Sequence, residues 1–118
     1  MDEPLTVTTT AANEHIAVLA AAGEIDHDSR RVLSDAAERA IRRGCRRIVI
    51  DLTDVTFCDS GGLSLFVQLH KTTGALGGQL RLAGVQYLVA AAIQATNLDR
   101  LLLLHPTVDE AVAAALRH

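Results

Sequence analysis

The stretch Ile48–Leu69, IVIDLTDVTFCDSGGLSLFVQL, decides the fold. It opens with β-branched apolar residues in a row, which predict a buried strand over Arg47–Leu52 that is covered on both faces. A polar connection follows over Thr53–Asp59, and Ser60–Gly62 then begins a helix with apolar side chains at helical spacing. A buried strand that leads into such a helix is typical of an α/β domain with parallel strands.

Upstream of this stretch, the sequence predicts an antiparallel hairpin and a first helix. Leu5–Thr10 alternates apolar with polar residues, whereas Ile16–Ala22 is apolar throughout, and only a short polar turn separates them. Asp28 or Ser29 can cap the helix that follows by accepting a backbone N–H, and this helix ends near Arg43. Because the helix connects the second strand to the third, we expect those two strands to pair in parallel.

Downstream, two more strands and two more helices are expected. The strands are at Leu80–Leu82 and Leu101–Leu104, and a helix over Val85–Ala95 lies between them. A last helix starts with a capping box, in which Thr107 and Glu110 each cap the backbone of the other. We expect the inward-facing side chains of these two helices to be Val85, Leu88, Val89, Ala92 and Ile93 in the first, and Val112 and Leu116 in the second.

The order β-β-α-β-α-β-α-β-α predicts one α/β domain, with a mixed sheet of four to five strands and helices packed on it. At 118 residues the chain is long enough for one core and too short for two. We therefore expect a single domain over residues 1–118, with its core at about residues 5–116. Aromatic residues make up only 3% of the chain, so the core is expected to consist of Ala, Val, Leu and Ile.

Composition and motifs argue against several classes of function. The net charge of −3 and the lack of a basic patch disfavour nucleic acid, and no apolar run reaches the roughly 18 residues that span a bilayer. The acidic N-terminus lacks an apolar signal segment, so a cytoplasmic protein is expected. The histidines and cysteines show no ligand spacing, and neither GxGxxG nor a Walker motif is present, so we expect no metal and no cofactor.

Ser60 stands where a buried strand meets the N-terminus of a helix, and this position allows two interpretations. Its hydroxyl can cap the helix by accepting a backbone N–H. Alternatively, the helix end favours anions and tolerates a phosphate on Ser60, which would add about −1.5 to −2 charges beside Asp59. Gly61 and Gly62 let backbone or a partner approach closely. One phosphoryl group can thus switch off a binding site at this helix end.

Motifs in three regions of the chain together resemble the STAS-domain anti-sigma factor antagonists of bacteria. Gly23–Asp26 resembles an upstream motif of that family, with Ser29 where Ser or Thr is usual. Ile48–Leu52 and then Val55–Leu63 resemble its signature, and Gly77–Leu82 fits its fourth strand. The resemblance covers nearly the whole chain, and it implies a single STAS-like domain.

The resemblance also implies a phosphorylatable binding switch. In that family, an anti-sigma factor with a kinase fold uses ATP to phosphorylate the serine that corresponds to Ser60. The unmodified protein binds the anti-sigma factor and frees the sigma factor, the phosphorylated form lets go, and a phosphatase resets it. Many members have a second Ser or Thr where Gly61 stands, so Ser60 is expected to be the only acceptor, in a more flexible loop. The implied partner-binding residues are Asp26, Asp59, Ser60, Gly61, Gly62 and Leu63.

Other interpretations fit the residues less well. Asp59–Gly62 also matches the string around the nucleophile of trypsin-like proteases, but those enzymes need two barrels and a placed His and Asp. Asp51 ends a strand, as in a response-regulator receiver, yet the acidic pair and late lysine of a receiver are missing. With no catalytic constellation, we expect a non-enzyme. A STAS adaptor without phosphorylation, in a stress-signalling scaffold or a lipid-transport assembly, is the alternative, and the oligomeric state stays open.

Overall fold

The computed structural model of the chain describes residues 4–117. The order of helices and strands is the one expected from the sequence, and the α/β class is confirmed. The elements are β1 (Thr6–Ala11), β2 (Ile16–Ile25), α1 (Arg30–Arg42), β3 (Arg47–Cys58), α2 (Ser60–Ala75), β4 (Gln79–Ala83), α3 (Tyr87–Ala95), a 3₁₀ turn (Leu98–Arg100), β5 (Leu103–His105) and α4 (Val108–Arg117).

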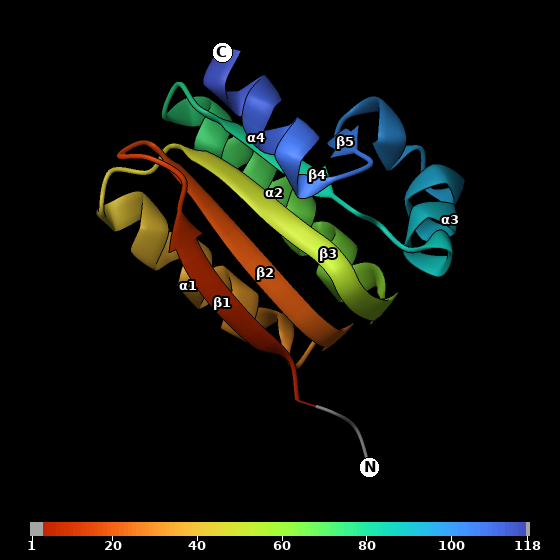
Figure 1. Cartoon of the computed structure of the whole chain (residues 1–118). Coiled ribbons are helices and arrows are strands. Elements are labelled where there is room, and N and C mark those ends of the chain that lie inside the picture. The colour runs from red at the N-terminus through yellow and green to blue at the C-terminus, as the bar shows by residue number, and fades with distance from the viewer. Residues whose placement is uncertain (1–3, 118) are drawn as a thin grey trace.

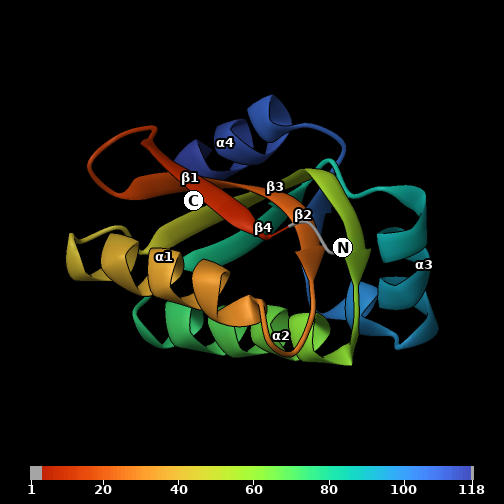
Figure 2. The same cartoon turned by 90° about the horizontal axis from the view of Figure 1, so that it is seen from below.

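The strands form one mixed sheet in the order β1-β2-β3-β4-β5. β1 pairs with β2 in antiparallel fashion, and every other neighbouring pair is parallel, as expected for strands joined through helices. α1 and α2 cover one face of the sheet, α4 lies on the other face, and α3 lies at one end (Figures 1 and 2). The larger core, which contains Leu33 and Phe66, lies under α1 and α2, and a smaller one lies under α4.

β3 crosses the whole molecule and positions the elements at both of its ends. At its start, Nη1 of Arg47 donates to the carbonyl oxygen of Ala115 in α4 at 3.1 Å. At its other end, Cys58 pairs with Ile25 of β2. β4 pairs with β3 only as far as Asp51, so the carboxyl-terminal half of β3 extends beyond β4.

β2 and β3 are both longer than the sequence pattern predicted. The expected ends were Ala22 and Leu52, and the segment 53–59 was interpreted as a connection, which is wrong for most of its length. Val55 and Cys58 face the core within this segment, and register shifts between the two strands break the simple alternation. Polarity suggested a loop here because the intervening side chains are exposed, namely Thr53, Asp54, Thr56 and Phe57.

Two leucines that were expected to face inward are largely exposed. The exposed fraction is 68% for Leu88 in α3 and 59% for Leu116 in α4. α4 instead turns alanines towards the sheet, and these short side chains let it lie close over Val49 and Ala83. The buried side chains are Val89 and Ile93 in α3 and Ala111, Ala114 and Ala115 in α4.

The last strand begins later than expected. β5 starts at Leu103 rather than at Leu101, because the 3₁₀ turn holds the Leu101 N–H against the carbonyl oxygen of Leu98 at 3.0 Å. The Thr107 hydroxyl accepts from the Glu110 N–H at 3.1 Å, which is one half of the expected capping box.

Candidate functional site

The carboxyl ends of β2 and β3 place two of the sequence motifs side by side. Ile25 pairs with Cys58, and the Asp59 N–H donates to the Ile25 carbonyl oxygen at 3.1 Å. The connection from β2 to α1 therefore lies against the first turn of α2, at the edge of the sheet where α/β folds bind ligands. Asp26 and Ser60 thus share one end of the molecule, although within residues 4–117 no hydrogen bond joins them.

Asp59, and not Ser60, is the N-cap of α2. Its Oδ1 accepts from the Gly62 N–H at 3.1 Å, and its Oδ2 accepts from the His27 N–H at 3.2 Å. Ser60 is the first helical residue, so the interpretation of its hydroxyl as the cap is wrong. The side chain at the cap position is the one that reaches the third helical N–H. A single carboxylate therefore caps α2 and also holds the β2–α1 connection against the N-terminus of this helix by a hydrogen bond.

The Ser60 side chain is exposed at the N-terminus of α2. The carboxylate of Asp59 already accepts a hydrogen bond from the Gly62 N–H, and the Ser60 hydroxyl makes no hydrogen bond to any residue in the range 4–117. A hydroxyl at this place is open to a modifying enzyme, and its position at the positive end of the helix dipole favours an attached anion.

Asp26 organises its own loop. Its Oδ1 accepts from the Asp28 N–H at 3.0 Å and from the Ser29 N–H at 2.7 Å. The Ser29 hydroxyl accepts from the Asp26 N–H and donates to the Glu24 carbonyl oxygen, both at 2.9 Å, so it is not the side-chain cap expected for α1. The hydrogen bond from the Ser29 backbone N–H is the largest cause that lowers the pKa of Asp26, and the carboxylate therefore stays ionised.

The two glycines after Ser60 are needed because the chain itself approaches them. A Cβ on Gly61 would lie 2.9 Å from the Cα of His27, and one on Gly62 would lie 2.5 Å from the Sγ of Cys58. Both glycines are buried residues of the first turn of α2. The expectation that Gly61 lies in a loop is therefore wrong, because this residue is helical and lies against the β2–α1 connection.

A cavity of about 350 Å³ lies beside Ser60, and we call it the apolar groove. Leu63 and Val67 line it from α2, and Thr96 and Leu98 line it from the end of α3 and the 3₁₀ turn. Among the described residues, its only polar side chains are hydroxyls, those of Ser60, Ser64 and Thr96. Helical spacing from Ser60 could have indicated that Leu63 and Val67 share its side of α2. Nothing in the sequence pattern linked Thr96 or Leu98 to these residues.

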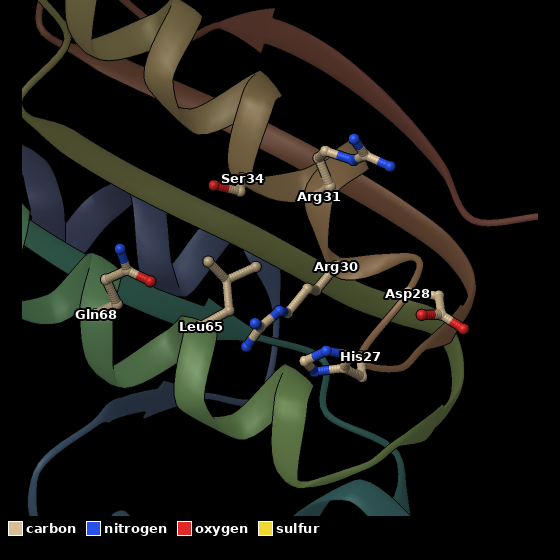
Figure 3. A pocket seen from close by; sticks show the side chains of 7 residues that line it. All are labelled: His27, Asp28, Arg30, Arg31, Ser34, Leu65 and Gln68. Atoms are coloured by element: carbon tan, nitrogen blue, oxygen red, sulfur yellow. The ribbon is translucent and has the colours of Figure 1, made fainter.

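A second cavity of about 350 Å³ lies between α1 and α2, and we call it the basic cavity (Figure 3). Leu65 is its one apolar lining residue within the range 4–117. Nη1 of Arg30 donates to the carbonyl oxygen of Gly61 at 3.4 Å, which links this cavity to the first turn of α2. Sequence reasoning missed it because its residues come from the β2–α1 connection and from two separate helices. The polar lining residues are His27, Asp28, Arg30, Arg31, Ser34 and Gln68.

The site holds no reactive thiol and no cluster of metal ligands in the described part of the chain. Burial, and secondarily the charge of Asp59, raises the pKa of the Cys58 thiol to about 12, so it stays protonated. Residues 4–117 contain no group of three or more His, Cys, Asp or Glu side chains that could hold a metal ion. None of the helices in this range is long and apolar enough to cross a bilayer.

Comparison with known proteins agrees with this geometry. A candidate anti-sigma factor antagonist of Thermotoga neapolitana is 31% identical over 72 residues, which cover 61% of this chain and 64% of that protein, just under two thirds of its length. A solved anti-sigma factor antagonist of Mycobacterium paratuberculosis is 25% identical, with a TM-score of 0.84 over 98% of both chains.

A third likeness concerns the fold alone. SpoIIAA, an anti-sigma factor antagonist solved in its unphosphorylated form, is 19% identical with a TM-score of 0.82, over 96% of this chain and 98% of that one. Its phosphorylated form, from Bacillus, has a TM-score of 0.73 at 18% identity, over 92% and 98% of the two chains. Finally, the sequence model of the STAS domain matches residues 8–111. The chain is therefore a member of the STAS domain family.

Proposed function

We propose that the protein is an anti-sigma factor antagonist, which binds a kinase-type anti-sigma factor until Ser60 is phosphorylated. The names of the Mycobacterium and Thermotoga relatives support the first part of this proposal. The role makes the chain a regulator of sigma-factor-dependent transcription in the cytoplasm rather than an enzyme. Its proposed partners are the anti-sigma factor with serine kinase activity and a phosphatase that reverses the modification.

The observation that carries the phosphorylation step is the exposed Ser60 hydroxyl. It does not cap the helix, because Asp59 accepts the hydrogen bond from the Gly62 N–H. Phosphorylation there would break no hydrogen bond within residues 4–117. The new group would add about −1.5 to −2 charges at a helix N-terminus, where the dipole favours it. That SpoIIAA, with the same fold, has been solved with and without phosphate supports the view that this fold tolerates the modification.

The apolar groove suggests how a phosphate on Ser60 would prevent binding. Leu63, Val67 and Leu98 offer apolar surface that suits an apolar side chain of the partner. A phosphate at the rim of this groove would have to lose water when the partner docks, and that desolvation is costly. The neighbouring carboxylate of Asp59 would add repulsion towards an acidic partner. We propose that Asp26, Gly61 and Gly62 contribute by shaping this surface.

Incubation with each co-encoded kinase-fold anti-sigma factor and ATP tests the proposal, with the intact mass as the readout. We expect the wild type to gain one phosphoryl group and Ser60→Ala to gain none. Ser64→Ala is the matched control, because Ser64 is exposed one turn further along α2 and lines the same groove. Modification of the Ser60→Ala protein, or association with a partner but no modification of the wild type, would contradict the switch; the second result would favour an adaptor.

Binding measured by calorimetry provides an independent test of the switch. Ser60→Asp should weaken the affinity for the anti-sigma factor by about tenfold or more, because like charges brought together at an interface cost several kcal/mol. The thermal midpoint should change little, because Ser60 is exposed and unbonded in the described chain. Unchanged affinity would contradict the proposed mechanism.

A further inference from the structure

The basic cavity carries positive charge that the described part of the chain does not neutralise. Arg30 and Arg31 contribute guanidinium groups, and among the described residues Asp28 is the one carboxylate in the lining. Within residues 4–117 the single ion pair joins Glu38 to Arg42 at 3.9 Å, in the carboxyl-terminal half of α1. The remaining polar groups of the lining can all donate hydrogen bonds, and they belong to His27, Ser34 and Gln68.

Arg30 is already directed across the cavity. Figure 3 shows its side chain extending from α1 towards α2 and lying near the His27 ring, whereas Arg31 turns away from α2. The contact from Arg30 to the Gly61 carbonyl oxygen is long, at 3.4 Å, and it uses one of the five N–H groups of a guanidinium. Arg30 is half-buried, so its position is restricted while most of its donors stay available.

We propose that the basic cavity receives an acidic side chain of the anti-sigma factor, an inference that rests on the function proposed above. A carboxylate matches the planar fork of Arg30, which can bind both carboxylate oxygens at once. The cavity of about 350 Å³ is large enough to admit such a side chain. Its unneutralised charge selects an acidic partner group over an apolar or a basic one.

The position of the cavity explains why a partner protein is its occupant. Ser60, Leu63 and Val67 line the apolar groove on one side of α2, whereas Leu65 and Gln68 line the basic cavity on another. A single surface laid across the N-terminal half of α2 would contact both cavities. A partner that brings a carboxylate to this end would also be repelled by a phosphate on Ser60, so the cavity adds to the effect of the switch.

Charge reversal at Arg30 tests this inference, with calorimetric affinity for the anti-sigma factor as the readout. Arg30→Glu should weaken binding by about tenfold or more at low salt, and higher ionic strength should narrow the difference. Arg42→Glu is the matched control, since it reverses the same charge in the last turn of α1, and its affinity should stay within about twofold of the wild type. Arg30→Lys keeps the charge but lacks the planar guanidinium, so its affinity should lie between those of Arg30→Glu and Arg42→Glu.

Three further measurements make the test decisive. Thermal unfolding of the Arg30→Glu protein shows whether a loss of binding comes from loss of the fold, and replacing the partner's acidic residue with arginine should restore binding to Arg30→Glu. If Ser60→Asp abolishes binding but Arg30→Glu binds like the wild type, this inference fails while the proposed function stands. If inorganic phosphate then shifts the Arg30 side-chain NMR signals, the cavity is a site for small anions. If the wild type binds no anti-sigma factor, both proposals fail.

Discussion

Substitution of Asp59 separates the two contacts that its carboxylate makes. Asp59→Ala removes the cap on the Gly62 N–H and the bond to the His27 N–H. Loss of an N-cap costs about 0.5–2 kcal/mol, and loss of a further hydrogen bond costs about 0.5–1.5 kcal/mol. The free energy of unfolding should therefore fall by about 1–3.5 kcal/mol. Asp59→Asn should cost about 0.5–1.5 kcal/mol, because its amide group can satisfy only one of the two N–H groups.

Urea unfolding followed by circular dichroism measures these differences, provided that the slope with denaturant is unchanged. Ser60→Ala is the internal control, and it should stay within about 0.5 kcal/mol of the wild type because its hydroxyl is exposed and unbonded in the described chain. The capping argument would be refuted if Ser60→Ala cost as much as Asp59→Ala. It would also be refuted if Asp59→Ala unfolded at the same urea concentration as the wild type.

Three further predictions concern packing, reactivity and pH. Gly62→Ala should lower the thermal midpoint, because its Cβ would lie 2.5 Å from Cys58 Sγ, whereas Gly74→Ala, with nothing within 4 Å, should gain about 0.5–1 kcal/mol; equal shifts would contradict the tight first turn. The raised pKa of Cys58 should make alkylation of this thiol slow in the folded protein at neutral pH, and rapid alkylation of Cys58 by iodoacetamide would contradict it. Burial, and then the Arg81 guanidinium at 2.9 Å, lowers the pKa of His105 in the folded state. The unfolded chain therefore binds more protons, and the contribution of His105 to stability, full above the unfolded value of about 6.5, should be lost as pH falls from there towards the folded pKa. Urea midpoints at about pH 7.5 and about pH 5.5 should differ more for the wild type than for His105→Gln, and equal differences would contradict this.

The sequence was sufficient to predict which elements exist and in what order. The β-branched residues at Ile48 and the helical hydrophobic period at Leu63 separated the strand from the helix, and a helical crossover required β2 and β3 to be parallel. It was insufficient for the ends of these strands, because register shifts let Val55 and Cys58 face the core within a polar segment. The sequence pattern also predicted that Leu88 faces inward, which is wrong because α3 buries only a narrow side of its surface.

The sequence placed Ser60 correctly at the start of a helix, but it did not predict the local geometry there. Asp59 and Ser60 are both good capping residues, and only the backbone conformation at the junction decides which of them is the cap. The glycines were expected to leave room for backbone or a partner, and the structure fills that room with the chain's own His27 and Cys58. The two cavities beside α2 combine residues from distant segments, so no local pattern could indicate them.

The length of β3 has a practical consequence for where a label or a surface linkage is attached to the protein. Its 12 residues span about 35 Å, with the Ser60 helix at one end and Ala115 of α4 hydrogen-bonded to Arg47 at the other. Thr6 pairs with Ala22, so β1 begins at the end of the sheet that carries Ser60. A fluorophore or biosensor linkage placed after α4 would therefore stand far from Ser60, whereas an affinity tag ahead of β1 would stand nearer to it.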